Sequence, residues 1–554
     1  MPGKFEAPRG GARRNPQSGS RQSGQTQSSR QPQQSRQSQY RQNQQSQYQQ
    51  PRQSQYRQTQ QPRQSQYRQS QQSQYRQPQR SGNQPPRNGS YAQHQRRSPF
   101  LPILLILLAL ILLLGFAAWK LLGSRDQKQP DPTKPGSSSL STQGTQPPTE
   151  ETEPPTETTM PEPEHVVATA TVSATGDLLM HKPIITAAYS DGSYNFDFIF
   201  KHLKPYAQET DYALANLETT LAGSSKPYQG YPYFNCPDEI VTAAKDAGFD
   251  MFLTANNHSF DTGLDGYLRT LEVVRGAGMD TLGTMASAED PKYAIKDING
   301  IKIGMLCYTY ETSDGTGSVP ALNGLPMNGL GYENLNCYLP SDPSRMYTEV
   351  EQYLGEMEEA GVEATIMFIH WGPQEYALTQ PSAHVAIAQK LCDLGIDVII
   401  GGHPHVVQPM DLLTSTVDPE HKTVCLYSMG NAVSNQRLGN LSSVSTAHTE
   451  DGVWISVTFS KYSDGTVYLD SVNLIPTWVY LNREYIILPL DYDRVDEWGT
   501  LYDINESTVN AAKASYTRTM ALVGDGLTAC QYYLAEAKEA REAAYLAAVQ
   551  PDAA

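Results

Sequence analysis

Five apolar segments of this 554-residue chain are each followed at once by side chains that could do chemistry. They read SATGDLLMH (173–181), LANLE (214–218), LTANNHSFD (253–261), IMFIHWG (366–372) and IIGGHPH (399–405). Each apolar run predicts a strand, and loops at the carboxyl ends of strands in an open α/β sheet converge on a common crevice. A single histidine after a strand is more often structural, but five such clusters together indicate one site at the sheet edge.

The donors in these clusters are imidazoles, carboxylates and amides, a mixture that suits Mn, Fe or Zn. Asp177, Glu218 and Asn257 supply hard oxygen atoms. Five of the 11 histidines lie in the clusters, namely His181, His258, His370, His403 and His405. The tripeptide His403-Pro404-His405 is the strongest element because proline fixes the backbone between two imidazoles, and a turn-stabilising role is its competing interpretation. Six cysteines without CxxC spacing indicate neither a zinc ribbon nor a dithiol site.

The elements that must position these groups alternate between strand and helix after Glu164, as in a layered α/β domain. The predicted strands are Val166–Ala174, Tyr212–Ala215, Met251–Ala255, Ile301–Tyr308, Ala364–Ile369, Asp397–Ile400 and Thr423–Ser428, with Val453–Phe459 and Val467–Leu474 as an antiparallel pair. The predicted helices are 237–247, 264–275, 343–360 and 382–394, ending at Gly248, Gly276, Gly361 and Gly395 as left-handed caps. A further amphipathic helix is predicted over Thr528–Val549.

The first 98 residues are rich in Gln, Arg, Ser and Tyr and lack the aliphatic side chains needed for a core. We expect this segment to be a disordered cytoplasmic tail. Sixteen arginines and Lys4 stand against Glu6 alone, so the tail is basic and the rest of the chain is strongly acidic. The tail could bind anionic lipid, but a specific nucleic-acid partner is not expected, because such charge runs are usually only solvated.

Residues 99–122 contain 20 consecutive uncharged residues, Phe100–Trp119, which is the length of a transmembrane helix. A cleaved signal peptide is the competing interpretation, but the apolar run is too long and begins too far from the N-terminus. Residues 123–164, rich in Pro, Thr and Glu, predict an extended linker. The expected protein is single-pass in the cell membrane, with a cytoplasmic N-terminus and an extracytoplasmic C-terminal domain.

The motifs GDLLMH, ANLETTL, ANNHSFDTGLDG, HWG, GGHPHVVQP and YSMGN, in this order, resemble those of the CapA family of poly-γ-glutamate capsule synthesis proteins. The resemblance covers about Val166 to Pro476 and implies a domain at 166–489 related to the calcineurin-like metallophosphoesterases. That relationship implies a four-layer αββα sandwich with two divalent metal ions at the sheet edge. Residues 490–554 are expected to form a C-terminal helical extension.

The resemblance also implies a role for each candidate residue. Asp177 and His181 would bind the first metal with His405, and Glu218 would bridge the two ions. The second metal would be held by Asn257, His370 and His403, and His258 would donate a proton to the leaving oxygen. The chain departs from the family pattern at HWGPQEY, at Ala432 and Asn435, and in the four-residue step from Asp177 to His181.

These observations predict a membrane-anchored protein that acts in synthesis or export of capsule poly-γ-glutamate or another envelope polymer, through a dinuclear hydrolase-type site. Its expected partners are an envelope polymer or phosphoester substrate and other capsule-synthesis membrane proteins. The alternative is a non-catalytic factor that binds the polymer or assembles an export complex. A third hypothesis is that the tail recruits a cytoplasmic polymerase.

Overall fold

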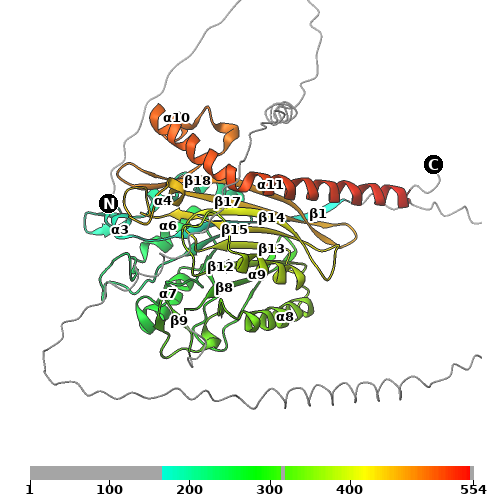
Figure 1. Cartoon of the computed structure of the whole chain (residues 1–554), viewed down its shortest axis with the longest axis horizontal. Helices are drawn as coiled ribbons and strands as arrows, with labels where there is room; N and C mark the ends of the chain where they lie inside the picture. Colours follow the sequence, from blue (N-terminus) through cyan, green and yellow to red (C-terminus); the bar gives the residue numbers. More distant parts are fainter. Residues whose placement is uncertain (1–164, 313–318, 550–554) are drawn as a thin grey trace, which may run out of the picture. The chain divides into compact units, whose positions relative to one another are not determined.

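The computed structural model describes residues 165–312 and 319–549, drawn in colour in Figure 1. The predicted tail (1–98), transmembrane helix (99–122) and linker (123–164) lie outside these residues. Within the described part of the chain, no helix combines the length and apolar character that crossing a bilayer requires.

One sheet has eight strands and carries the first three of the polar clusters. Strands β1, β4, β5 and β6 are parallel, as is the short β16 beside β1, whereas β17, β18 and β19 continue the sheet in antiparallel pairs. The bounds are β1 Val166–Leu178, β4 Tyr212–Leu217, β5 Met251–Leu253, β6 Asp280–Leu282, β16 Asn431–Val433, β17 Asp451–Tyr462, β18 Val467–Leu481 and β19 Tyr485–Pro489.

A second sheet has seven strands and carries the other two clusters. Strands β11, β8, β12, β13 and β15 are parallel, and β7 and β14 pair with them in the antiparallel sense. The bounds are β7 Ala294–Ile298, β8 Ile301–Tyr310, β11 Cys337–Tyr338, β12 Ala364–His370, β13 Val398–Gly402, β14 Val407–Thr414 and β15 Lys422–Met429. The predicted clusters therefore come from two sheets and not from one.

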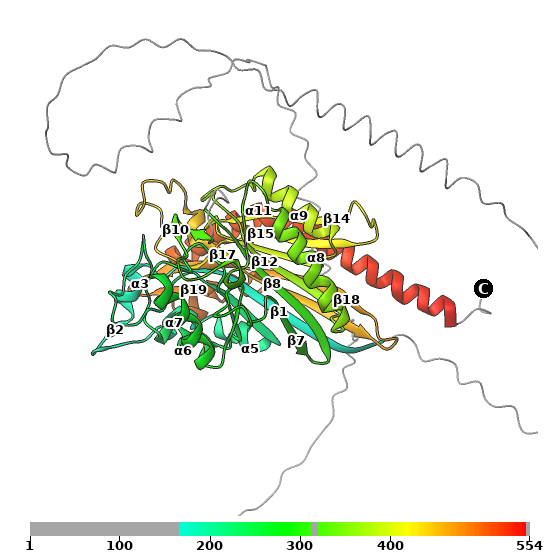
Figure 2. The same ribbon diagram turned by 90° about the horizontal axis from the view of Figure 1, so that it is seen from below.

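The two sheets pack face to face, because Val172 and Ile455 of the first sheet share one core cluster with Ile303 and Phe368 of the second. Helices cover the outer face of each sheet (Figures 1 and 2). On the first sheet these are α3 (Lys182–Ala187), α4 (Asp197–Phe200), α5 (Lys204–Glu209) and α6 (Glu239–Ala247), and on the second α8 (Ser344–Glu359) and α9 (Ser382–Asp393). The layers therefore run helix, sheet, sheet, helix, in a mixed α/β fold.

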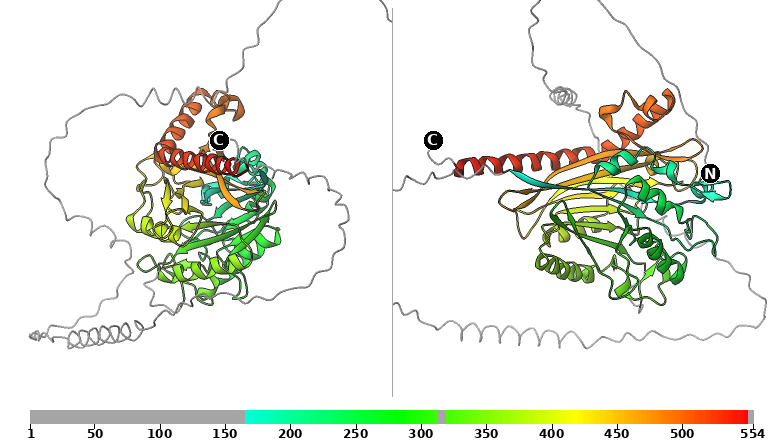
Figure 3. Two further views of the ribbon diagram at one scale, coloured as in Figure 1. Left: turned by 90° about the vertical axis from the view of Figure 1, so that its right-hand side faces the viewer. Right: turned by 180° about the vertical axis from the view of Figure 1, so that it is seen from behind.

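The C-terminal helix α11 (Glu506–Val549) contacts both sheets, at β14 and at β18 (Figure 3). Val523 and Leu527 belong to the same core cluster as the facing sheets. Arg518 pairs with the buried Asp451 carboxylate at 2.7 Å. The predicted helix Thr528–Val549 is only the second part of α11, whose first part contains two glycines and so gives a weaker sequence signal.

Three of the four predicted helix caps are confirmed, with left-handed φ values of 110° at Gly248, 75° at Gly361 and 97° at Gly395. The prediction for Gly276 is wrong, because α7 (Gly263–Gly276) includes it and the left-handed residue is Gly278, at φ 78°. A cap at Gly278 lets the Met279 N–H donate to the Val274 carbonyl at 3.2 Å, which satisfies the end of the helix.

Two glycines of α11 provide a matched test of its packing. A Cβ at Gly526 would lie 1.7 Å from the Met410 carbonyl oxygen of β14, whereas a Cβ at Gly524 would be 3.6 Å from the Met520 side chain. Either Gly→Ala change adds up to about 1 kcal/mol of helix propensity. We expect Gly524→Ala to raise the free energy of unfolding, and Gly526→Ala to lower it by about 1–3 kcal/mol through overpacking. Thermal denaturation followed by circular dichroism measures both, and equal stability of the two variants would contradict this packing.

Candidate metal centre

The predicted site residues lie where the carboxyl ends of strands from both sheets meet. Asp177 lies near the end of β1, and Glu218 directly follows β4. Asn257 and His258 follow β5, His370 ends β12, and His403 and His405 follow β13. The two sheets meet at this point, as the distance of 3.1 Å between His405 Nδ1 of the second sheet and Asp177 Oδ2 of the first shows. The convergence predicted from the strand ends is thus observed, across two sheets.

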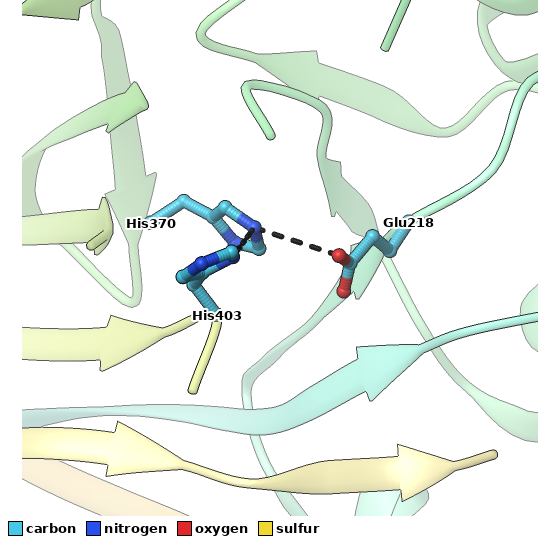
Figure 4. Close-up of side chains that lie close together, drawn as sticks. All are labelled: Glu218, His370 and His403. Atoms are coloured by element: carbon cyan, nitrogen blue, oxygen red, sulfur yellow. Dashed lines mark hydrogen bonds and ion pairs between the residues drawn. The ribbon is translucent and has the colours of Figure 1, made fainter. Parts of the chain in front are cut away.

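One group of candidate ligands consists of Glu218, His370 and His403, shown in Figure 4. His370 Nε2 lies 3.6 Å from Glu218 Oε1 and 3.2 Å from His403 Nδ1. The amide oxygen of Asn257 lies 2.8 Å from the same His370 nitrogen. The four residues assigned to the second metal and its bridge therefore lie together.

A second group consists of Asp177, Glu218 and His405. His405 Nε2 lies 3.8 Å from Glu218 Oε1, while its Nδ1 faces Asp177 Oδ2 at 3.1 Å and Asn431 Oδ1 at 3.2 Å. Two acceptors at Nδ1 place the proton on that nitrogen and leave Nε2 available as a ligand. In each group the ligand atoms lie within 4.8 Å of one another. Glu218 belongs to both groups, as expected of a bridging ligand.

Unsatisfied buried atoms show that this donor set fits metal ions. Both carboxylate oxygens of Glu218 and Nε2 of His403 are buried without a hydrogen-bond partner. The Glu218 and His403 side chains are fully buried. A buried carboxylate with no hydrogen bond is costly, unless a cation compensates it. Two divalent cations held by these groups would satisfy the orphaned atoms.

The charges of the site shift the pKa values of its groups in opposite directions. Burial acts to lower the pKa of His405, but the Glu218 charge and the Asp177 hydrogen bond outweigh it and raise this pKa to about 9. Burial acts to raise the pKa of Asp177, but the His405 hydrogen bond and charge lower it overall. Burial and the neighbouring imidazoles keep the pKa of His403 well below its usual range. His403 is therefore neutral, as a ligand must be, and a metal would displace a proton from His405.

Glycines and a strained turn bring the two histidines of the HPH tripeptide to the site. A Cβ at Gly401 would lie 2.1 Å from the Tyr427 carbonyl oxygen, and one at Gly402 would lie 3.2 Å from Asp177 Oδ1. His403 and His405 have positive φ values of 93° and 56°. Such conformations are costly for non-glycine residues and cluster at functional sites. Glycine at both positions thus lets this turn approach Tyr427 and Asp177 closely.

His258 forms a pair with Asp261, one turn further along the chain. Its Nδ1 lies 2.7 Å from Asp261 Oδ2, and both side chains are nearly buried. Burial acts to lower the pKa of His258, but the hydrogen bond and charge of Asp261 raise it overall. The carboxylate holds the proton on Nδ1 and orients the ring, so Nε2 is the nitrogen that can exchange a proton with a ligand. This geometry suits the proton donor that the resemblance assigns to His258.

His181 belongs to neither group of candidate ligands. Its Nδ1 lies 3.1 Å from the Leu179 carbonyl and 3.2 Å from the Asn435 backbone nitrogen, and burial lowers its pKa to about 4. Its ring packs edge-on against Phe234, which packs in the same way against His258. His181 therefore lies beside the site, and its role as a ligand of the first metal stays a prediction.

Three asparagines and Asp261 join the site without having been assigned a role from the sequence. Asn216 donates from Nδ2 to Asp177 Oδ1 at 2.8 Å, and Asn431 holds His405. Asn323 contacts both Asn257 and His258. Asn216 precedes Glu218 by two residues, and strand periodicity places the two on one face, so a signal for Asn216 was present. Asn323 had no such signal, because its Asn-Gly pair is already explained as a turn.

The sequence of this domain was compared with models of known protein families. The sequence model described as "Bacterial capsule synthesis protein PGA_cap" matches residues 171–436, which include every candidate ligand. Residues 171–436 of the chain thus match this family. The recognition based on the motifs is thereby confirmed.

Two proteins from bacilli that are named for capsule or PGA biosynthesis are similar to part of this chain. The capsule biosynthesis protein CapA of Bacillus anthracis is 26% identical over 355 residues, which are 61% of this chain and 78% of that protein. The PGA biosynthesis protein CapA of Bacillus subtilis strain 168 is 28% identical over 272 residues, 48% of this chain and 63% of that protein. The chain thus spans just under two thirds of the second relative.

Among solved structures, the calcineurin-like phosphoesterase YfkN of Bacillus subtilis aligns with 62% of this chain and 99% of its own length. The identity is 16% and the TM-score is 0.32. A likeness at this level supports no inference about activity.

The shared position of Glu218 leads to a prediction on metal content. Glu218→Gln removes the negative charge from both groups, so we expect it to lose both ions, whereas His403→Ala should lose only one. Elemental analysis of the purified full chain, in detergent and with Mn²⁺ added and excess removed, measures the content, with about two ions expected in wild type. In EDTA, Glu218→Gln should unfold at the same or a higher temperature than wild type, because a buried uncompensated charge is gone. Retention of both ions by Glu218→Gln would contradict the bridging role.

Proposed function

We propose that this PGA_cap protein takes part in synthesis or export of an anionic capsule polymer, and that its site is a dinuclear metal hydrolase. The polymer class is suggested by the names of the two relatives from bacilli, which refer to capsule and PGA biosynthesis. The observation that carries the enzymatic part is the Glu218 carboxylate, which lies buried and without a hydrogen-bond partner between two sets of candidate ligands. A purely structural carboxylate would have hydrogen-bond partners in this position.

The roles of the side chains follow from their positions. Asp177, Glu218 and His405 would hold one ion, and Glu218, Asn257, His370 and His403 the other. Two bound divalent ions would supply Lewis acidity and make a water nucleophilic near neutral pH, which suffices for hydrolysis of a phosphoester or an amide. His258, oriented by Asp261 at 2.7 Å, would protonate the leaving oxygen or nitrogen from Nε2. The burial of all these groups excludes bulk water from the reacting atoms.

The proposal extends to the cell surface through the segments that precede the described domain. Residues 99–122 would anchor the chain as a single transmembrane helix, with the basic tail inside and the linker holding the domain outside the membrane. This arrangement would keep the domain next to the exit of a membrane-bound polymer synthase. Other capsule-synthesis membrane proteins are therefore the partners we propose, and the tail is the segment that would contact a cytoplasmic polymerase.

The depth of the site favours one alternative, a polymer-binding or assembly factor without turnover. The six ligands proposed above are each at most 4% exposed, and His258 is 6% exposed. A polymer chain must therefore gain access to these buried side chains before it can be cleaved. If it cannot, the same domain would bind the polymer at its surface and the ions would serve a structural role.

Turnover by a His258 variant distinguishes the two functions. Removing a general acid typically costs about 10²–10⁴-fold in rate. We expect His258→Gln to lower kcat by this amount toward a generic phosphodiester or poly-γ-glutamate with Mn²⁺, while metal content stays at the wild-type level. Asp261→Asn should lower kcat less, because the ring remains but is less well oriented. The assay uses the full chain in detergent.

A matched control for these variants is His202→Gln. The His202 ring packs against Tyr502, which belongs to a core cluster around Trp498 that contains no candidate site residue, so this substitution should not affect turnover. Metal-loaded wild type that turns over neither substrate but binds poly-γ-glutamate would overturn the hydrolase and support the binding factor.

A further inference from the structure

A small hairpin outside the two main sheets reaches the metal centre. It consists of β9 (Ala321–Leu322) and β10 (Leu325–Pro326), joined by Asn323-Gly324. The φ values of 48° and 73° at these two residues fit a type I′ turn, for which Asn-Gly is the preferred pair. The backbone alone thus explains an asparagine at this position, and its side chain needs a separate explanation.

The Asn323 side chain fixes the orientation of a candidate metal ligand. Its Oδ1 accepts a hydrogen bond from Asn257 Nδ2 at 3.1 Å, and Asn257 Oδ1 then faces His370 Nε2 at 2.8 Å. An amide binds a metal through its oxygen only, since the nitrogen has no available lone pair. Rotation of the Asn257 amide by half a turn would present the NH₂ group to the metal. The Asn323 carbonyl opposes this rotation, because its oxygen accepts from the Asn257 NH₂ group and would face a second oxygen after the rotation.

The same side chain also contacts the proton donor. Asn323 Nδ2 lies 3.3 Å from His258 Nδ1, the nitrogen that faces Asp261. That nitrogen already donates to the Asp261 carboxylate, so the Asn323 NH₂ group, itself a donor, makes no hydrogen bond with it and is only a close neighbour. One exposed residue therefore touches a candidate ligand and the candidate acid, which are both buried.

We propose that Asn323 is a positioning residue of the metal centre, which holds the Asn257 amide oxygen toward the metal. This inference rests on the proposed function, because it assigns Asn323 to the dinuclear site. Groups that orient a metal ligand typically contribute about 10–100-fold to metal affinity or activity. A residue present only for its turn would contribute nothing to either.

Two substitutions at this position separate the side chain from the turn. Asn323→Gly keeps a residue that adopts positive φ but removes the amide, whereas Asn323→Asp keeps the turn and an oxygen that can accept from Asn257. We expect Asn323→Gly to weaken Mn²⁺ binding by about 10-fold or more at the second metal site, which includes Asn257. Asn323→Asp should restore affinity close to wild type. Isothermal titration of the full chain with Mn²⁺ measures the affinity, and thermal denaturation checks that both variants are folded.

A second Asn-Gly turn in the chain provides the control. Asn299-Gly300 joins β7 to β8 with φ values of 55° and 84°, and the Asn299 side chain also makes two hydrogen bonds, to Thr169 and Asp211. Asn299→Gly should leave Mn²⁺ affinity unchanged. Unchanged affinity in Asn323→Gly, or equal losses in Asn299→Gly, would overturn this inference while leaving the proposed function intact. A wild-type chain that binds no Mn²⁺ would overturn both.

Discussion

The Glu218 carboxylate is fully buried, and neither of its oxygens has a hydrogen-bond partner. Isolated burial of this charge costs several kcal/mol, so the surroundings must compensate it. They do so partly through His405, whose pKa the carboxylate raises to about 9. Asp177 is a second buried carboxylate beside the same imidazole, so a single imidazolium cannot offset both charges. Bound cations would therefore explain the position of Glu218 between two sets of candidate ligands.

Most of the fold can be related to this requirement. Glu218 comes from the first sheet, whereas His370, His403 and His405 come from the second. The sheets must therefore pack with their carboxyl ends at the same end of the sandwich, and the shared core between them fixes this relation. Helix α11 contacts strands of both sheets and adds to the same core. Arg518 of this helix pairs with Asp451 on β17, and β17 lies next to β1, the strand that carries Asp177. The C-terminal helix thus helps to hold together the two halves of the metal centre.

Much of this could be predicted from the sequence, because the information is local. Apolar runs followed by polar clusters show where strands end, and a glycine after a helical period marks a cap, as at Gly248. The cap of α7 was predicted at the wrong residue because two glycines, Gly276 and Gly278, lie close together at its end. Strand β14 was not predicted because Pro409 interrupts it, and proline is tolerated there only since β14 is an edge strand. Neither the division of the strands between two sheets nor the reach of Asn323 to a residue 66 positions away has a local signature.

The central claim is that two metal ions share the Glu218 carboxylate. Anomalous diffraction at the Mn edge, from crystals grown with Mn²⁺, tests it most directly because it locates the ions without reference to activity. The account predicts two anomalous peaks about 3.5–4 Å apart on either side of Glu218, one beside Asp177 and His405 and one beside His370 and His403. A single peak away from Glu218, or no peak within this cluster at saturating Mn²⁺, would contradict it.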